Sequence, residues 1–251
     1  MKKNLPWLFL ALFWPAAALA GEEILVAVAA NVEYAMPELK EVFETQTGIE
    51  VKTVVNSSGK LTAQIRSGAP FDVFLSADLK YPDSLFASGH ADSLPRVYAY
   101  GAIVLWTLQE VELSKGMEIL ASASIRRIAI ANPQTAPYGE AALQALNYYQ
   151  IYEQVKTKLV YGRNVAQATQ YIVTGAAEAG FTAKSVAISP QMAGKGKWIE
   201  IDPAAYAPIA QGMVILKHGA EEHPRAVRAF YDFMLGEAAG KILQTYGYRL
   251  P

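Results

Sequence analysis

The stretch that decides the fold is ILVAVAANVEYAMPELKEVFETQTG, residues 24–48. Residues 24–29 are all apolar, which predicts a strand buried on both faces. The next apolar residues recur at helical spacing and predict a helix that buries one face: Val32, Met36, Leu39 and Phe43. Pro37 indicates that this helix begins near it or has a distorted first turn, and Gly48 is suited to end it. A buried strand followed by an amphipathic helix is the repeating unit of α/β proteins.

The same alternation continues along the chain. Further strands are predicted at 51–55, 72–76, 102–106, 128–131, 180–182 and 214–216. Helices are predicted at 61–67, before Gly89, at 140–149, at 165–173, and in the tail around Val227, Phe230, Tyr231 and Met234. We therefore expect an α/β fold with mainly parallel sheets. No internal repeat or Gly/Ser-rich linker separates two domains, so any second domain must be joined without a flexible tether.

The first twenty residues have the pattern of an export signal. Lys2 and Lys3 precede a run of mostly apolar residues at 5–19, and Ala18-Leu19-Ala20 fits a cleavage site. The alternative is a membrane anchor, but the apolar run is short for the ~20 residues that such a span needs. We predict a signal peptide at 1–20 and a mature chain that begins at Gly21.

Composition excludes several classes of function. The formal net charge is −1, and it becomes −3 when Lys2 and Lys3 are removed with the signal, so no basic face for nucleic acid is expected. The absence of cysteine excludes cysteine nucleophiles, zinc–thiolate sites and iron–sulfur clusters. The three histidines, His90, His218 and His223, are scattered and form no metal-binding motif.

Motifs of catalysis and nucleotide binding are also missing. The chain has no G-x-S-x-G elbow. Residues 57–60, SSGK, faintly resemble a phosphate loop, but the first glycine is absent and Leu61 stands where a magnesium ligand would be. These absences argue against an enzyme, although a hydrolase without a recognisable motif stays open.

Short polar residues occupy the turns between predicted strands and helices: Asn31, Ser57-Ser58, Pro137-Tyr138-Gly139 and Arg163-Asn164-Val165. In a parallel sheet these turns meet at the carboxyl ends of the strands, where ligands bind. Each helix start has unpaired N–H groups and a partial positive charge, so several converging starts make an anion site. Ordinary helix capping, with Asn31 as one such cap, is the alternative for each turn taken alone.

These turns belong to a chain that resembles the periplasmic molybdate-binding proteins of ABC importers over essentially its whole mature length. The most specific stretch is GAPFDVFLSAD at 68–78, supported by AAN at 29–31, NSSGKL at 56–61 and AFYDFM at 229–234. The resemblance implies a two-lobed periplasmic-binding-protein fold of type II, with a mainly parallel sheet flanked by helices in each lobe. Lobe I would comprise 21–100 plus 212–251 and lobe II 101–211, joined by two crossover segments.

The resemblance also implies a site for molybdate or tungstate. Its residues would be Ala30, Asn31, Ser58, Tyr138 and Val165, the last two acting mainly through their backbone N–H groups. Molybdenum would be held as molybdate, without direct metal ligands or a cofactor. Some members add a tyrosine where this chain has Ala183. The implied setting is a monomer in the periplasm that delivers its ion to the permease of an ABC transporter in the inner membrane.

Three alternatives stay open from the residues alone. The first is a binder of sulfate or another oxyanion, in which Lys60, Arg66 or Arg163 could grip the ion instead of lining the rim of the cleft. The second is an exported hydrolase that uses Ser58 or Tyr138. The third is a ferric-ion binder, because the chain contains 14 tyrosines.

Overall fold

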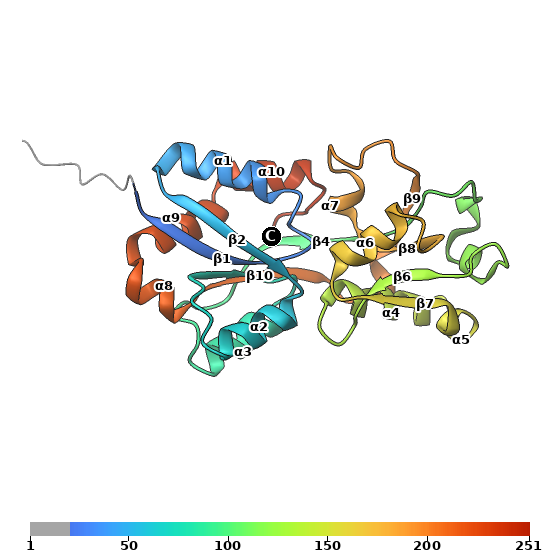
Figure 1. Cartoon of the computed structure of the whole chain (residues 1–251), viewed down its shortest axis with the longest axis horizontal. Helices are drawn as coiled ribbons and strands as arrows, with labels where there is room; N and C mark the ends of the chain where they lie inside the picture. The colour runs from blue at the N-terminus through green and yellow to red at the C-terminus, as the bar shows by residue number, and fades with distance from the viewer. Residues whose placement is uncertain (1–20) are drawn as a thin grey trace, which may run out of the picture.

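The computed structural model describes residues 21–251, so the predicted signal peptide lies outside the described residues. The chain forms two five-stranded sheets side by side, each flanked by helices (Figure 1). The first sheet has the order β2-β1-β3-β10-β4. Its strands are β1 (Glu23–Ala29), β2 (Glu50–Asn56), β3 (Val73–Leu75), β4 (Arg96–Gly101) and β10 (Ile209–Ile215).

Helices cover both faces of this sheet. They are α1 (Met36–Thr47), α2 (Ser58–Arg66), α3 (Lys80–Ala87), α8 (Lys217–Glu222), α9 (Pro224–Met234) and α10 (Glu237–Thr245). Alternate residues of β1 face opposite layers: Val26 packs with the apolar residues of α1, α9 and α10, whereas Ala27 packs with those of α2 and α3. Phe43 of α1 meets Phe230 of α9 edge to face, with ring centroids 5.2 Å apart.

The second sheet has the order β7-β6-β8-β5-β9. Its strands are β5 (Ile103–Thr107), β6 (Ile128–Ala131), β7 (Leu159–Gly162), β8 (Ala179–Ala183) and β9 (Lys197–Glu200). The helices of this half are α4 (Pro137–Tyr148), α5 (Tyr152–Val155), α6 (Val165–Val173), α7 (Lys184–Ala187) and the 3₁₀ segments η1 (Leu113–Ala121), η2 (Lys156–Lys158) and η3 (Pro203–Ala205). Leu105 faces the cluster that contains α4 residues, and Trp106 faces α6.

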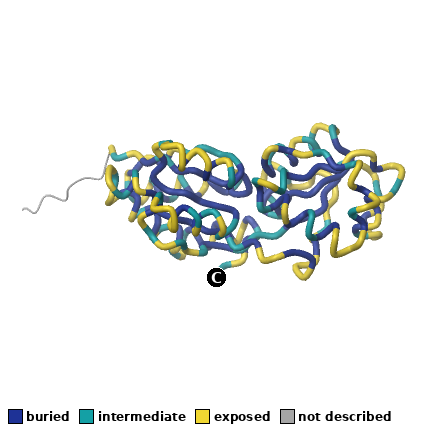
Figure 2. Tube along the Cα trace, turned by 90° about the horizontal axis from the view of Figure 1, so that it is seen from below, coloured by how far each residue is buried: buried dark blue, intermediate teal, exposed yellow. Residues whose placement is uncertain are grey.

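The chain passes between the sheets by short direct connections. Strand β4 of the first sheet is followed, after Ala102, by β5 of the second, and β9 of the second leads through η3 back to β10 of the first. Seen from below in Figure 2, buried backbone fills the middle of each half, and the segments that join the halves run between them. The two halves therefore form two lobes without a flexible tether.

The predicted fold class is confirmed, with one refinement. In each sheet three strands run parallel, β2-β1-β3 and β7-β6-β8, and the next strand, β10 or β5, is antiparallel to its neighbours. The sheets are therefore mixed. Strand β6 has the predicted bounds, and Pro37 lies in the first turn of α1, so the helix begins there without distortion. Within residues 21–251 no helix is both long and apolar enough to span a membrane.

Candidate functional site

The five predicted site residues line one small cavity between the lobes. Ala30 and Asn31 follow β1, Ser58 begins α2, Tyr138 lies in the first turn of α4, and Val165 begins α6. The remaining lining residues are Ala29, Ser57, Ala77, Ala136, Pro137 and Asn164. The cavity has a volume of about 10 Å³, far below the ~300–1,000 Å³ of sites for drug-sized ligands. A cavity of this volume excludes a drug-sized ligand.

The helix starts give this cavity its polarity. Helices α2, α4 and α6 begin at its wall, at the carboxyl ends of β2, β6 and β7. Among the described residues, no protein acceptor pairs with the N–H groups of Ser58, Tyr138 or Val165, nor with that of Asn31. Unpaired N–H groups and the positive ends of helix dipoles favour an anion at this place.

Two serine hydroxyls add to these N–H groups. Ser58 Oγ accepts the N–H of Ala77 at 3.0 Å, and its own proton has no acceptor among the described residues. Ser57 Oγ is buried and without a hydrogen-bond partner. A buried hydroxyl without a partner is costly, so both groups are available to a ligand oxygen.

The prediction that Asn31 caps the first helix is wrong. Helix α1 begins only at Met36, five residues after Asn31, and Ala35 precedes it without a side-chain cap. The Asn31 side chain instead reaches distant segments, with Nδ2 at 2.7 Å from Gln211 Oε1 and 3.0 Å from Tyr248 Oη. A long-range hydrogen-bond network replaces the local one. By contrast, Asn164 caps α6 as expected, accepting the N–H of Gln167 at 2.9 Å.

Around Asn31 lies a buried polar network that the sequence patterns missed. The hydroxyls of Ser185 and Tyr248 lie 2.9 and 2.8 Å from the backbone oxygen of Asn31, and Tyr138 Oη lies 3.4 Å from Gln211 Nε2. Burial raises the pKa of Tyr248 to about 12 and that of Tyr138 well above its ordinary value, so both hydroxyls keep their protons at neutral pH.

Hydrogen bonds join the two lobes on both sides of the cavity. On one side, Gly59 N–H donates to Thr135 O at 2.9 Å, and Tyr81 Oη donates to Gln134 O at 3.4 Å. On the other side, Ser185 of α7 donates to Asn31 O at 2.9 Å. The lobes are therefore closed onto each other, with direct contacts on two sides of the cavity.

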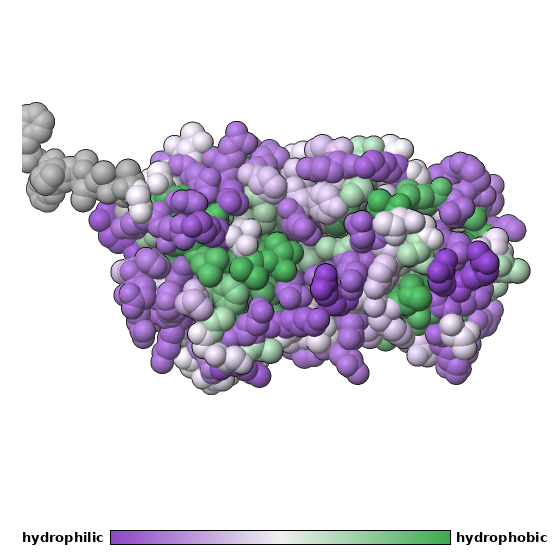
Figure 3. Space-filling model, in the orientation of Figure 1, coloured by the Kyte–Doolittle hydropathy of each residue, from purple (hydrophilic) through white to green (hydrophobic). Residues whose placement is uncertain are grey.

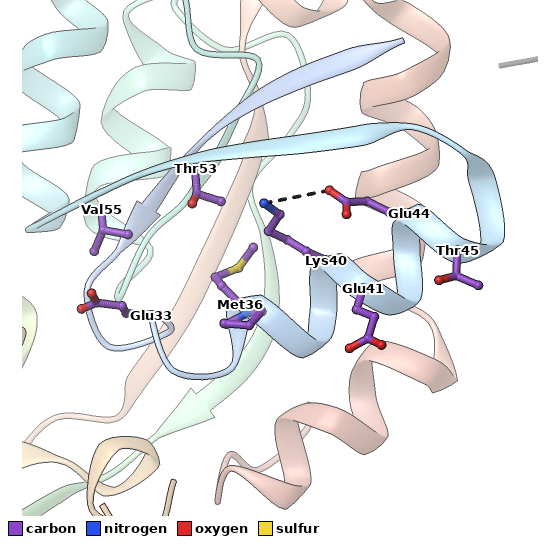
Figure 4. A pocket seen from close by; sticks show the side chains of 9 residues that line it. Glu33, Met36, Lys40, Glu41, Glu44, Thr45, Thr53 and Val55 are labelled. Atoms are coloured by element: carbon purple, nitrogen blue, oxygen red, sulfur yellow. Dashed lines mark ion pairs between the residues drawn. The ribbon is translucent and has the colours of Figure 1, made fainter. Parts of the chain in front are cut away.

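No charged side chain lines the cavity. Lys60, Arg66 and Arg163 are exposed and are not part of its wall. A larger and more open cavity of about 780 Å³ lies on the outer side, between α1 and β2 (Figure 4). Its wall includes Glu33 and Glu41 as well as the Lys40–Glu44 pair at 3.9 Å, so its carboxylates oppose anion binding.

Ala183, the position at which the family resemblance implied a tyrosine in some members, is fully buried at the end of β8. Ser185 lies two residues later in the chain, and its hydroxyl is 3.1 Å from that of Tyr248 in the C-terminal tail. Both contact the backbone of Asn31 and not the Ala183 position itself.

The described residues contain no group of three or more His, Cys, Asp or Glu side chains arranged to hold a metal ion. The three histidines are scattered in the sequence, but the ring centroids of His218 and His223 are only 6.2 Å apart. His218 also pairs with the buried Asp72, with Nδ1 2.8 Å from Oδ1. The face of the molecule seen in Figure 3 is mostly hydrophilic, with smaller apolar areas between the polar ones.

Comparison with known proteins places this architecture in a class. A family model described as bacterial extracellular solute-binding protein matches residues 24–249. The molybdate-binding protein ModA of Azotobacter vinelandii is 38% identical over 237 residues, which are 94% of this chain and 93% of the relative. That of Rhodobacter capsulatus is 36% identical, covering 96% of this chain and 92% of the relative.

Solved structures of binding proteins have the same fold. The periplasmic molybdate-binding protein of Azotobacter vinelandii superposes with a TM-score of 0.86 at 33% identity, over 91% of this chain and 99% of that one. The sulfate-binding protein SubI of Mycobacterium tuberculosis shares the fold, with a TM-score of 0.75 at 18% identity over 91% of this chain and 87% of that one.

The two lobes with a small enclosed cavity between them define a periplasmic-type binding protein. The chain belongs to the bacterial extracellular solute-binding protein family, whose members bind solutes and are not enzymes.

Proposed function

We propose that this protein captures molybdate, or its close analogue tungstate, in the cavity between its lobes. The observation that carries the proposal is the enclosed wall of uncharged hydrogen-bond donors, gathered where α2, α4 and α6 begin. Ala30, Asn31, Ser58, Tyr138 and Val165 would surround the ion, and Ser57 would join them. The relatives named molybdate-binding proteins, which share more than a third of its residues, support the same ligand.

A wall made of donors selects for the charge state of the ligand. Molybdate at neutral pH is a dianion that accepts hydrogen bonds and has no proton to donate. A protonated phosphate would need an acceptor for its proton, and no carboxylate lines the cavity. Each hydrogen bond to the charged ion contributes roughly 1.5–3 kcal/mol net, so about six of them suffice for micromolar or tighter binding after the cost of association.

Size would then separate molybdate from sulfate. Both are tetrahedral dianions with the same acceptors, but molybdate has the longer bonds from its central atom to oxygen. A rigid cavity that fits the larger ion leaves the oxygens of sulfate too far from some donors, and unpaired buried donors are costly. Molybdate and tungstate differ little in size, so the same wall accepts both.

Titration calorimetry of the mature chain with molybdate, tungstate, sulfate and phosphate tests the proposal. We expect tight binding of molybdate and tungstate, with sulfate and phosphate weaker by at least about a hundredfold, or roughly 2.7 kcal/mol. Sulfate binding as tight as molybdate binding would contradict the size argument and favour a general oxyanion binder.

The other functions considered from the sequence have less support. A hydrolase that uses Ser58 would need a base, but Ser58 Oγ contacts the N–H of Ala77 and no histidine, Asp or Glu lines the cavity. A ferric site would need several tyrosinates, whereas burial raises the pKa of Tyr138 and Tyr248 and keeps both protonated.

The cellular setting follows from the same proposal. After export and removal of residues 1–20, the protein would act as a monomer in the periplasm and deliver its ion to an ABC permease of the inner membrane. Lobe I would comprise 21–100 plus 212–251 and lobe II 101–211, so the proposed boundaries fall at the end of β4 and within β10. The lobes would open and close about these crossovers, and the bound ion would favour the closed state.

A further inference from the structure

The orientation of the Asn31 amide conflicts with an anion in the cavity. Asn31 is 1% exposed and lines the cavity, and its Oδ1 is buried without a hydrogen-bond partner. Its Nδ2 donates instead to Gln211 Oε1 and Tyr248 Oη. An unpaired amide oxygen beside the ligand would repel the oxygens of a dianion, while the donor that the anion needs is used elsewhere.

A half-turn of two amides removes this conflict. If the Asn31 and Gln211 amides both rotate, Asn31 Oδ1 accepts from Gln211 Nε2 over the 2.7 Å that now separates Nδ2 and Oε1. Tyr248 Oη lies 3.0 Å from Asn31 Nδ2 before the rotation. After it, Asn31 Oδ1 occupies that place and accepts the Tyr248 hydroxyl proton. Gln211 Oε1 then takes the place of Nε2, at 3.4 Å from Tyr138 Oη, and accepts the hydroxyl proton. Asn31 Nδ2 is left free to bind the anion.

The rotation gives up one long backbone bond, from Gln211 Nε2 to Ile209 O at 3.4 Å, and keeps the bond to the backbone of Asn31. Ser185 Oγ donates to Asn31 O at 2.9 Å, so the Tyr248 proton can leave that oxygen for the side chain of Asn31. Asn31 Oδ1, which lacks a partner before the rotation, gains Gln211 Nε2 and Tyr248 Oη as donors, and the Tyr138 hydroxyl gains Gln211 Oε1 as an acceptor. A buried network in which each donor meets an acceptor is the more stable one.

We propose that Gln211 is the positioning residue that turns the Asn31 amide toward the ligand, and that Tyr138 and Tyr248 fix this orientation. The inference rests on the proposed anion-binding function and deepens it. It also gives Tyr138 two roles, since its backbone N–H lies at the cavity and its hydroxyl holds Gln211.

Gln211, which orients the Asn31 amide, lies next to one of the segments that cross between the lobes. Gln211 is fully buried in β10, beside the bulge at Gln211/Gly212 where the pairing with β4 shifts. The Gly101 backbone packs against it, because a Cβ at Gly101 would lie 2.8 Å from Gln211 Nε2 and 2.1 Å from Tyr138 Oη. The amide that orients Asn31 therefore lies against the segment about which the lobes would move.

Gln211→Met in the mature chain tests the proposal, because Met fills the same space without donating to Asn31. We expect molybdate affinity to fall about tenfold or more, while Gln244→Met, an exposed position on α10, leaves it unchanged. Tyr138→Phe should lower the affinity by about three- to tenfold, since Gln211 Oε1 then loses its donor.

A spectroscopic readout separates orientation from general damage. The mature chain has five asparagines, Asn31, Asn56, Asn132, Asn147 and Asn164, so ¹⁵N-asparagine labelling gives few side-chain signals. Addition of molybdate to the wild type should shift the Asn31 NH₂ protons strongly, with the signal assigned by its loss in Asn31→Ala. In Gln211→Met this shift should be much reduced, while Gln244→Met should retain it.

The outcomes are distinct. Wild-type protein that binds no oxyanion would contradict the proposed function itself. Wild-type binding together with unchanged affinity and an unchanged Asn31 shift in Gln211→Met would overturn the positioning role alone. If Gln211→Met does not fold, Tyr138→Phe decides in the same way: reduced affinity and a reduced shift support the role, and wild-type values of both overturn it.

Discussion

The backbone N–H of Gly59 donates to the backbone oxygen of Thr135 at 2.9 Å, and this bond joins α2 of one lobe to the segment before α4 of the other. The approach requires glycine. A Cβ at position 59 would lie 2.7 Å from Tyr81 Oη, 3.0 Å from Thr135 Cα and 3.1 Å from Thr135 O. The tyrosine hydroxyl can move away, but the contacts with Thr135 are with backbone atoms of the other lobe, which must shift by a few tenths of an ångström to admit a methyl group.

Gly59→Ala should therefore weaken ligand binding through closure. The backbone of Gly59 is helical, so alanine favours α2 by up to about 1 kcal/mol and the ligand-free protein should be at least as stable as the wild type. We expect molybdate affinity to fall about tenfold or more, and small-angle scattering with ligand to show a larger radius of gyration than for the wild type.

Gly240→Ala is the matched control, because Gly240 also lies inside a helix, and its added Cβ would meet only the side chain of Leu250. Wild-type affinity in Gly59→Ala would show that closure tolerates a methyl group at this contact.

Ser58→Ala tests the contact at the start of α2. The substitution removes a hydroxyl that has a free proton at the cavity, and it also deprives the Ala77 N–H of its acceptor at 3.0 Å. We expect calorimetry to show molybdate binding weaker by roughly 1–3 kcal/mol. Ser67→Ala, at the exposed far end of the same helix, should leave the affinity unchanged, and an unchanged value for Ser58→Ala would mean that the ion binds elsewhere.

Molybdate affinity should be nearly constant between about pH 7 and about pH 9. No charged side chain lines the cavity, and burial raises the pKa of Tyr248 to about 12 and that of Tyr138 well above its usual range. A group with a raised pKa keeps its proton until the pH approaches that value, so both hydroxyl donors remain intact over this window. Calorimetry across the window measures this, and a steep loss of affinity with rising pH would indicate a histidine or lysine at the ion.

Local patterns were sufficient for the α/β class and for the turns around the cavity, whereas the two-lobed arrangement was predicted from the family resemblance. The apolar residues 24–29 and the helical spacing up to Phe43 depend on interactions within one strand or one helix, and they form β1 and α1. Strands β4, β7 and β9 went unpredicted, because residues that are at least partly exposed interrupt the apolar pattern in each, whereas the predicted strands β3 and β6 are fully buried. The mixed character of the sheets arises from β10 returning beside β3, a pairing across more than a hundred residues that periodicity does not encode.

The hydrogen-bond network around Asn31 could not be predicted from local patterns either. Asn31 is followed by a helix, so capping was the natural local expectation, yet its amide pairs with Gln211 and Tyr248, which are 180 and 217 positions away. Nothing near these two residues in the sequence marks them as partners. Only the fold brings the crossover strand and the C-terminal tail to the end of β1.

Glu178 should stabilise lobe II in a pH-dependent way. Its side chain is 11% exposed and accepts the N–H groups of Arg126 and Arg127 at 3.2 and 2.7 Å. Burial alone would raise the pKa of this carboxyl, but the hydrogen bonds from the Arg127 and Arg126 N–H groups and the nearby Arg127 charge outweigh burial and lower it. A carboxyl whose pKa is lower in the folded state contributes its stability above the unfolded value of ~4.3 and loses it as the pH falls through the folded value.

Glu178→Gln should therefore lower the free energy of unfolding by about 1–3 kcal/mol at neutral pH, because the negative charge is lost and the amide NH₂ then faces the guanidinium groups of Arg126 and Arg127 that now lie near Oε1. The difference from the wild type should shrink as the pH falls below about 4 and the wild-type carboxyl becomes protonated. Urea titrations at neutral and acidic pH measure both values, with Glu118→Gln as an exposed control. A difference that is the same at both pH values would contradict the role of the ionised carboxylate, because only its charge depends on pH in this range.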